Sequence, residues 1–310
     1  MPCFHPKSCW YLPQQKLISF SDQYSKPIPG IRESIQLPCR KCIGCRLEYS
    51  RQWAMRIYHE QSLWPNSIFV TLTYNNDNLP KIGKKGNLIK KDFQDFMKRL
   101  RQPNQELDWY PPKTIRYFHA GEYGEKNDRP HYHAVIFNCN FSDRKPLKGF
   151  KGLSTSETLK SIWGKGYESI GDVTFESASY VAGYIQKKIN GKLKDSHYAV
   201  IDPQTGEYFG QRQQEYATMS RRPGIAGLWL AQHKSDIYPS DNIHINGREM
   251  RPPKYYDRLY EIDNPDIMSE IKKNRKEHMQ QNAHLHTPEA LAQAKLNLKA
   301  RMSIYKRGKL

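Results

Sequence analysis

The run Arg-Pro-His-Tyr-His-Ala-Val-Ile-Phe, at residues 129–137, decides the fold and points to the chemistry. β-branched and aromatic residues follow a proline, a pattern that predicts a β-strand. Side chains alternate between the two faces of a strand, so His131 and His133 share one face and Tyr132 lies on the other. Neutral imidazole is a common metal ligand, and two on one face would form half of a metal site. A polar strand edge would show the same pattern, so the choice between a metal site and a polar edge depends on the neighbouring sequence.

The chain is strongly basic, which narrows the class of partner. It has 310 residues, with 49 Lys and Arg against 31 Asp and Glu, and a formal net charge of +18. Such an excess favours a polyanionic partner, nucleic acid before an anionic membrane. No apolar run approaches the ~20 residues that span a bilayer, and the first residues lack the pattern of a secretory signal. We therefore expect a soluble, intracellular protein whose six cysteines are reduced.

A cysteine-rich segment precedes the strand. Three cysteines recur at intervals of three residues around a glycine, namely Cys39, Cys42 and Cys45. Their thiols can converge on one ion, and zinc takes four ligands. We assign Cys3 as the fourth ligand of a zinc knuckle, with Cys9 and His5 as alternatives. Disulfides would suit an oxidising compartment better than this one. A helix over residues 47–59 should pack against the knuckle.

A second strand, predicted over residues 114–123, precedes the His-x-His strand at 130–138 and is separated from it by a short polar turn. The two should pair as a hairpin, which would bring Glu122 close to His131 at the turn end. Two imidazoles and a carboxylate with open positions suit a divalent ion that also binds substrate. Glu125 and His119 compete with Glu122 as the third ligand.

The remaining pattern predicts a strand at 67–74, helices at 90–101 and 155–163, a strand at 171–176 and a helix at 177–189. With the hairpin, this order fits an α+β architecture in which helices pack on one face of an antiparallel sheet. The last helix carries Tyr180 and Tyr184, which share a helix face, followed by Lys187 and Lys188. An amphipathic helix with tyrosines at its rim would look the same.

The last third of the chain is turn-rich and then helical. Arg221 and Arg222 precede Pro-Gly, where two guanidiniums could face phosphates or lie in a plain surface turn. Asn-Gly at 246–247 predicts a hairpin turn. The tail at 266–310 is expected to be helical and basic, with Thr287 capping a helix that starts at Pro288.

Three of these elements together resemble a known family. The Phe-Val-Thr-Leu-Thr-Tyr strand, the His-x-His strand and the Tyr-x3-Tyr helix with its lysines resemble, in this order, the HUH endonucleases that initiate rolling-circle DNA replication. The resemblance covers residues 65–190. The tyrosine pair, the cysteine knuckle and the segment at 220–224 look most like the initiators of gokushovirus-type microviruses, small single-stranded DNA phages. Gly183 departs from related phage initiators, which often carry Lys between the tyrosines, so Lys187 or Lys188 could take that role.

The resemblance implies an RRM- or palm-like sheet and a defined chemistry. A Mg²⁺ or Mn²⁺ ion would polarise a phosphodiester, tyrosine attack would give a 5′-phosphotyrosine and a 3′-OH primer, and the strand could be rejoined without ATP. The implied catalytic residues are Tyr180, Tyr184, Lys187 and Lys188, and the implied metal ligands are His131, His133 and Glu122. We add Arg129, Arg221 and Arg222 as DNA contacts, and Zn²⁺ as a structural ion at Cys39, Cys42, Cys45 and Cys3.

These expectations set domains, partners and location. The expected parts are a Cys-rich segment at 1–64, the endonuclease core at 65–190, a basic accessory region at 191–265 and a basic helical tail at 266–310. The expected partners are single-stranded DNA with the viral origin and a host helicase and polymerase. A host helicase is expected because the sequence has no P-loop with which to unwind DNA itself. The expected location is the cytoplasm of the infected bacterium, with no membrane partner.

Three alternatives stay open at this point. An HUH transposase or relaxase would use the same metal and tyrosine chemistry. A non-catalytic zinc-knuckle DNA-binding protein would use its tyrosines only to stack on bases. Charge alone would also admit a protein of the membrane surface, although the aromatic-rich strands argue against it.

Overall fold

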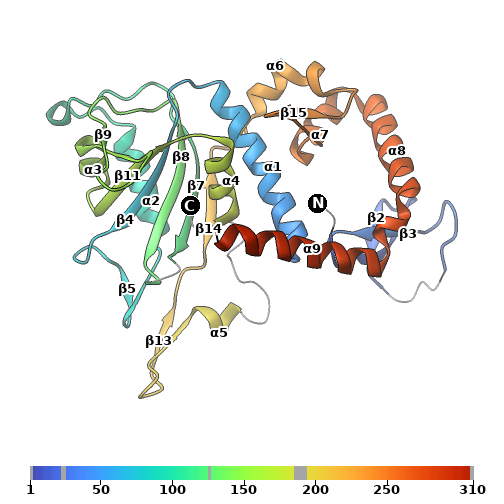
Figure 1. The fold of residues 1–310 in the computed structure, drawn as a ribbon, viewed down its shortest axis with the longest axis horizontal. Coiled ribbons are helices and arrows are strands. Elements are labelled where there is room, and N and C mark those ends of the chain that lie inside the picture. The colour runs from blue at the N-terminus through green and yellow to red at the C-terminus, as the bar shows by residue number, and fades with distance from the viewer. Residues whose placement is uncertain (1–2, 22–25, 125–126, 185–193, 308–310) are drawn as a thin grey trace. The chain divides into compact units, whose positions relative to one another are not determined.

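The structure is a computed structural model that describes residues 3–21, 26–124, 127–184 and 194–307 (Figure 1). By its internal contacts the chain forms two compact units, a larger one at Ser50–Asp263 and a smaller one made of Met1–Tyr49 and Asn264–Leu310. Among the described helices, none is long and apolar enough to cross a membrane.

The larger unit is built on a seven-stranded antiparallel sheet in the order β14-β7-β8-β4-β11-β10-β9. Its strands are β4 (Ile68–Tyr74), β7 (Arg116–Tyr123), β8 (Pro130–Phe137), β9 (Lys145–Pro146), β10 (Ser154–Thr155), β11 (Gly166–Asp172) and β14 (Tyr216–Met219). β7 and β8 pair as the predicted hairpin, and β4 lies on the other side of β8. The predicted α+β class with a large antiparallel sheet is confirmed.

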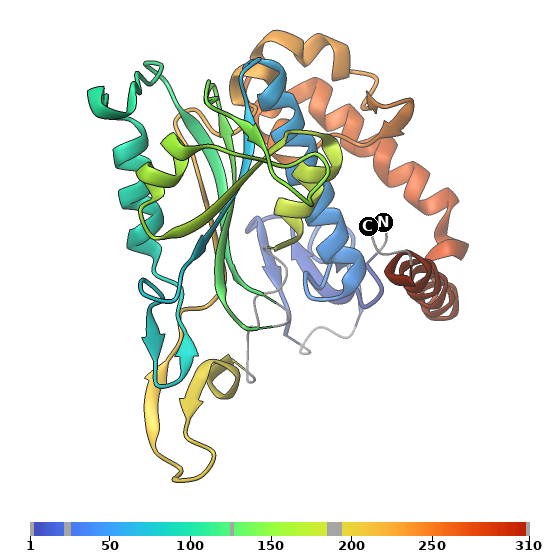
Figure 2. The same cartoon turned by 60° about the vertical axis from the view of Figure 1, so that its left-hand side comes forward.

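Helices cover both faces of this sheet, so the expectation of helices on one face was wrong (Figure 2). α2 (Lys90–Leu100) and α3 (Glu157–Trp163) pack on the face that carries Tyr132. The later part of α1 (Ile43–Ser62), together with α4 (Phe175–Tyr184), packs on the face that carries Val135. The reason is that β7 and β8 bury nearly all of their side chains, and a sheet with two apolar faces needs cover on both.

The strand predicted at 171–176 was placed wrongly. β11 ends at Asp172, and α4 begins at Phe175 rather than at 177. Thr174 N donates to Ser177 Oγ (2.8 Å) and Ser177 N donates to Thr174 Oγ1 (3.1 Å). This reciprocal pair of bonds satisfies backbone groups at a helix start, so the chain leaves the strand here.

Short elements complete the larger unit. They are β5 (Lys81–Ile82), β6 (Lys85–Gly86), η1 (Gln105–Leu107), α5 (Lys194–Tyr198), β12 (Ala199–Ile201), β13 (Tyr208–Gln211), α6 (Gly227–Ile237), β15 (Ile243–Ile245), β16 (Arg248–Met250) and α7 (Lys254–Asp263). The predicted hairpin turn joins β15 to β16, with positive φ at both Asn246 (51°) and Gly247 (72°), as this turn class requires.

The smaller unit combines a three-stranded sheet with terminal helices. Its elements are β1 (Lys7–Leu12), β2 (Leu17–Ser19), β3 (Glu33–Leu37), the first turns of α1, α8 (Pro265–Gln281), η3 (Ala283–His286) and α9 (Pro288–Arg307). The predicted cap of the last helix is confirmed, because Ala290 N donates to Thr287 Oγ1 (3.2 Å) and Pro288 is the first helical residue.

Candidate active site

The two histidines of β8 sit at the centre of the sheet. His131 lies opposite Glu122 of β7 on one side and opposite Thr73 of β4 on the other, and His133 lies opposite Thr71. Directly opposed residues of paired strands share a face. Strand alternation and register therefore bring all five side chains to the same face, the one that α4 covers in part.

A threonine hydroxyl orients each imidazole. Thr73 Oγ1 lies 2.9 Å from His131 Nδ1, and Thr71 Oγ1 lies 3.0 Å from His133 Nδ1. When Nδ1 carries the proton and donates to the hydroxyl, Nε2 keeps its lone pair for a cation. The alternation in Thr71-Leu72-Thr73 places both hydroxyls on one face of the strand, but the pattern alone does not show that they contact the imidazoles.

Glu122 brings a carboxylate to the face that carries the two imidazoles. The side chain of Glu122 is only 3% exposed, and its Oε1 lies 3.1 Å from His133 Nε2. A Cβ added at Gly124 would lie 2.8 Å from His131 Nε2, so the glycine leaves space beside that nitrogen. The donor atoms of His131, His133 and Glu122 do not all lie within 4.8 Å of one another, and the two imidazole centroids are 6.2 Å apart. His131 must therefore reorient for all three to bind one ion.

The two rivals for the third ligand position have different outcomes. His119 lies on the opposite face of β7, where its ring stacks on Phe93 with centroids 3.4 Å apart, so it cannot join His131. Burial there lowers the pKa of His119 well below its ordinary value. Residues 119 and 122 are an odd number of positions apart, so strand alternation already separates them. Glu125 lies outside the described residues.

Tyr180 places a phenol beside the histidines. It lies on α4, its ring meets that of His133 edge-on at 5.7 Å between centroids, and it also meets Phe69 at 6.4 Å. The side chain is 55% exposed, so a substrate can reach it. Tyr184 is the last residue of α4 that the structure describes, and its side chain is outside the description. Lys187 and Lys188 lie outside the described residues.

The three arginines proposed as DNA contacts are not brought together. Arg129 donates from Nη1 to Tyr74 O (2.6 Å) and from Nη2 to Asn76 Oδ1 (2.5 Å), so it fastens the start of β8 to the end of β4. Arg221 and Arg222 are exposed, and neither guanidinium has a hydrogen bond or ion pair within the described part of the chain.

The turn that carries Arg221 and Arg222 lies at the far end of β7 from Glu122. Ser220 N donates to Tyr117 O (3.0 Å), and five residues of strand from Tyr117 to Glu122 span ~17 Å. Arg221 and Arg222 therefore lie at the opposite end of β7 from Glu122 and its partner His131.

A buried ion pair holds this turn, and sequence reasoning missed it. Arg116 Nε lies 2.5 Å from Glu60 Oε1, Ala226 N donates to Glu60 Oε2 (2.5 Å), and Arg116 Nη2 donates to Pro223 O (2.9 Å). Glu60 is 0% exposed. In the sequence both charges look like ordinary surface residues, because only the long-range packing of α1 on β7 buries them.

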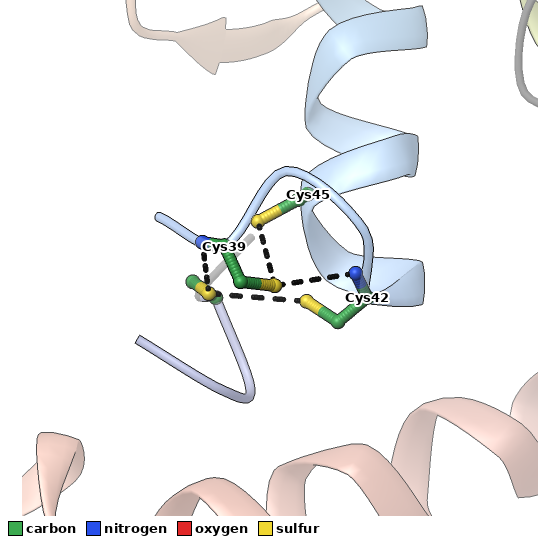
Figure 3. Close-up of side chains that lie close together, drawn as sticks. Cys39, Cys42 and Cys45 are labelled. Carbon is green, nitrogen blue, oxygen red and sulfur yellow. Dashed lines mark hydrogen bonds between the residues drawn. The ribbon is translucent and has the colours of Figure 1, made fainter. Parts of the chain in front are cut away.

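The cysteines of the smaller unit form a second candidate centre (Figure 3). The four sulfurs of Cys3, Cys39, Cys42 and Cys45 all lie within 4.8 Å of one another, and no other described group of three or more potential ligands is this close. Burial would raise the pKa of the Cys42 thiol, but hydrogen bonds from backbone and thiol groups lower it to about 6. Burial and the thiol of Cys3 raise the pKa of Cys45.

The two alternative fourth ligands are engaged elsewhere. The Cys9 thiol is buried in the small sheet and donates to Ile35 O (3.6 Å), and His5 Nε2 lies 2.9 Å from Lys295 Nζ. Cys3 is therefore the residue that joins the other three thiols. All six cysteines are free.

Comparison with known proteins gives a consistent set of relatives. Residues 67–189 match the family model of the replication-associated protein ORF2/G2P. The chain is 32% identical over 272 residues to the replication-associated protein VP4 of Bdellovibrio phage phiMH2K, covering 86% of this chain and 79% of that protein. It is 34% identical over 235 residues to the replication-associated protein ORF2 of Spiroplasma virus 4, covering 73% and 68% of the two chains.

A third relative is matched over a smaller share of its length. The chain is 32% identical over 234 residues to the replication-associated protein ORF4 of Chlamydia phage 1, which covers 73% of this chain and 54% of that protein. No solved structure matches the chain.

Proposed function

This chain belongs to the family of the replication-associated proteins ORF2/G2P, as a microvirus-type rolling-circle initiator, and from this premise we propose that it nicks and rejoins viral origin DNA by HUH-type chemistry. The observation that carries the proposal is the contact between the accessible Tyr180 and His133, the residue that also neighbours Glu122. A nucleophile, two imidazoles and a carboxylate thus share one face of one sheet.

The residues that would hold a divalent ion are His131, His133 and Glu122. The ion, Mg²⁺ or Mn²⁺, would supply positive charge to the non-bridging oxygens of the scissile phosphate. The chain contributes the placement of these groups. Thr71 and Thr73 set the orientation of the imidazoles, and the buried carboxylate of Glu122 draws positive charge to this point on the sheet.

Tyr180 would supply the nucleophile. Its phenol, with an ordinary pKa of about 10, must give up its proton to attack. A bond then forms between Oη and phosphorus, and the bond from phosphorus to the 3′ oxygen breaks. The DNA keeps a free 3′-OH, which takes up a proton, and the 5′ end stays on the tyrosine. Because one phosphodiester linkage is exchanged for another, the reverse attack by a 3′-OH on the phosphotyrosine rejoins the strand without ATP and releases the tyrosine.

Tyr184 lies one helical turn beyond Tyr180 on α4, which supports alternation between two nucleophiles. One tyrosine would hold the old 5′ end while the other cuts the newly made origin. The positive charges of Lys187 and Lys188 would help the tyrosine phenol to lose its proton. The net charge of +18 supports binding of single-stranded DNA, while duplex unwinding and synthesis would come from a host helicase and polymerase.

A nicking assay tests the proposal. The substrate is end-labelled single-stranded DNA carrying the candidate origin, incubated with Mg²⁺, Mn²⁺ or EDTA. The proteins are wild type, Tyr180→Phe, Tyr184→Phe, the double variant and, as a control, Tyr110→Phe, an exposed tyrosine in the loop before β7. We expect metal-dependent cutting and a covalent protein–5′-DNA product in wild type and Tyr110→Phe, and neither in the double variant.

Two outcomes would change the conclusion. Cutting by the double variant would assign the attack to water or to another side chain. Tight DNA binding without cutting by any protein would favour a non-catalytic DNA-binding module. A transposase or relaxase would instead cut strands that do not carry the replication origin.

A further inference from the structure

We propose that Cys3, Cys39, Cys42 and Cys45 form a tetrahedral zinc site that ties the N-terminal segment to the start of α1. Zinc–sulfur bonds of ~2.3 Å in a tetrahedron place the sulfurs ~3.8 Å apart. The measured separations are 4.0 Å between Cys39 and Cys45 and 3.9 Å between Cys42 and Cys3. The ligands therefore already stand almost at the spacing that the ion requires.

Backbone amides point at the sulfurs in the way that thiolates need. Cys39 N donates to Cys3 Sγ (3.2 Å), Cys42 N donates to Cys39 Sγ (3.3 Å) and Phe4 N donates to Cys42 Sγ (3.3 Å). A disulfide needs sulfurs ~2.05 Å apart, far below the observed separations. Four sulfurs within 4.8 Å of one another, three of which accept amide hydrogens, fit one soft cation better than any disulfide pairing.

The smaller unit has a physical need for such a link. Its N-terminal part leaves Leu17, Ile18 and Phe20 exposed, and the buried apolar side chains that the structure describes in the whole unit are Phe4, Cys9, Met268, Ile271 and Leu291. A core this small rarely supports a folded unit alone, and a structural metal commonly supplies the missing stability. The site joins residue 3 to residues 39–45 and so closes the loop that contains β1, β2 and β3.

Metal analysis of the purified full chain tests the site. We expect inductively coupled plasma mass spectrometry to find one zinc per chain. After exchange of zinc for Co²⁺, the absorption spectrum should show thiolate charge-transfer bands and the d–d bands of tetrahedral Co²⁺. Cys42→Ser and Cys3→Ser should lose the zinc and the bands. Cys9→Ser, a thiol of the same small sheet, and Cys139→Ser in the larger unit should keep both.

Wild-type protein without zinc after reconstitution under reducing conditions would overturn the proposal, and so would full zinc content in Cys42→Ser. Should the serine variants fail to fold, the Co²⁺ spectrum of wild type decides, because octahedral bands without thiolate charge transfer contradict four sulfur ligands. None of these readouts depends on nicking.

A separate observation concerns Tyr167, and we infer that its ring stacks on a DNA base next to the scissile phosphate; this inference rests on the proposed function. Tyr167 of β11 lies opposite Thr73 of β4, which lies opposite His131 of β8. All three share the face of the candidate site, and two strand spacings separate Tyr167 from His131 by ~10 Å.

The ring of Tyr167 has nothing to bind within the described structure. It is 68% exposed and makes no aromatic contact or side-chain hydrogen bond with any described residue. Single-stranded DNA is held by aromatic rings that stack on bases beside basic surfaces. Tyr180 lies beside His133 and Phe69, and Tyr167 lies level with His131 two strands away, so a DNA strand whose phosphate lies at the histidines has a base within reach of Tyr167.

Affinity for an origin oligonucleotide, measured by fluorescence anisotropy in EDTA, tests this role without nicking. We expect Tyr167→Ala to weaken binding by ~5- to 100-fold, Tyr167→Phe to bind like wild type, and Tyr110→Ala to be neutral. An abasic nucleotide at one position should weaken wild type but not Tyr167→Ala.

Unchanged affinity of Tyr167→Ala would overturn the stacking role. Loss of the covalent product in Tyr167→Phe, with Mg²⁺ present, would also overturn it, because the hydroxyl and not the ring would then matter. Failure of wild type to nick would instead reject the proposed function and leave the affinity comparison standing.

Discussion

Glu122 on β7 and His131 on β8 are direct cross-strand partners, yet the carboxylate of Glu122 lies against His133, one pleat further along, at 3.1 Å. The hairpin register therefore places one carboxylate on the same face as both imidazoles. His131, for its part, is turned toward the hydroxyl of Thr73. Substitutions at neighbouring residues can therefore change the orientation of an imidazole while both histidines are kept.

Thr73→Val should weaken metal binding while the fold persists, because valine keeps the shape of threonine and removes the partner of His131 Nδ1. Loss of such an outer partner typically costs ~10- to 100-fold in metal affinity. Mn²⁺ affinity by calorimetry is the measurement. Thr218→Val is a matched control, since Thr218 Oγ1 lies 2.9 Å from Nδ1 of His119 on the opposite face. Equal Mn²⁺ affinity in both variants would show that Thr73 has no such role.

Strand alternation made the centre of this site predictable from local sequence. Residues 131 and 133 are two positions apart in a strand, so their side chains share one face. The short polar turn before Arg129 predicts the hairpin that brings Glu122 next to His131. Burial of the aromatic positions of α2, Phe93 and Phe96, likewise follows from helical spacing. Each of these inferences uses residues that are close in the chain.

The rest depends on pairings between distant residues, which periodicity does not encode. β14, at residues 216–219, pairs with β7 almost a hundred positions earlier, and its four residues carry no strong strand signal. The cover of both sheet faces requires α1, whose place is set by its packing on β7 and β8. Cys3 joins the other thiols only because β1 and β3 pair and return the chain to it.

Gly124→Ala should displace the imidazole of His131. The new Cβ would lie 2.8 Å from Nε2, closer than side chains approach, so it would occupy space beside that nitrogen and limit how the ring can turn to bind a cation. We expect lower Mn²⁺ affinity and slower nicking, with little loss of stability, because Gly124 is only partly buried. Gly183→Ala is the control, since a Cβ there meets nothing within 4 Å. Wild-type Mn²⁺ affinity in Gly124→Ala would refute the steric account.

Stability should fall between pH 6.5 and pH 5. Burial lowers the pKa of His59 to about 3, with a smaller contribution from His233, against 6.5 in the unfolded chain. Above pH 6.5 the imidazole is neutral in both states and adds no pH dependence. Below it the unfolded chain takes up a proton that the folded chain does not, which removes ~2 kcal/mol by pH 5.

Urea unfolding at pH 7, 6 and 5 measures this effect. His59→Phe keeps an aromatic ring to stack on Trp229, 3.6 Å away between centroids, and should flatten the pH dependence by about one proton. Part of the dependence should remain, because the pKa of the buried His119 shifts in the same direction. An unchanged slope in His59→Phe would mean that His59 is protonated in the folded chain.

Glu60→Gln should destabilise the larger unit strongly. The substitution leaves the guanidinium of Arg116, itself buried, without its carboxylate, and removal of one partner of a buried pair costs ~3–5 kcal/mol. Urea unfolding at neutral pH provides the measurement. Glu157→Gln removes an exposed carboxylate paired with Lys160 and should cost less than ~0.5 kcal/mol. A similar loss of unfolding free energy in both variants would show that the buried Glu60–Arg116 pair contributes no more to stability than an exposed pair.

The paired substitution Arg221→Gln with Arg222→Gln should reduce the salt dependence of DNA binding rather than its sequence preference. The buried Glu60–Arg116 pair holds this turn, so its two exposed guanidiniums are presented on a fixed backbone. Each phosphate contact to a single strand contributes ~0.7 to the slope of log K against log salt. We therefore expect the slope to fall by ~1.4, together with weaker binding at low salt.

Arg129→Gln is the control and should leave the slope unchanged. Arg129 already donates from Nη1 and Nη2 to Tyr74 and Asn76 and so holds β8 to β4. If instead Arg129→Gln lowers the slope and the double variant does not, DNA follows the turn end of the β7–β8 hairpin and bypasses the Arg221–Arg222 turn.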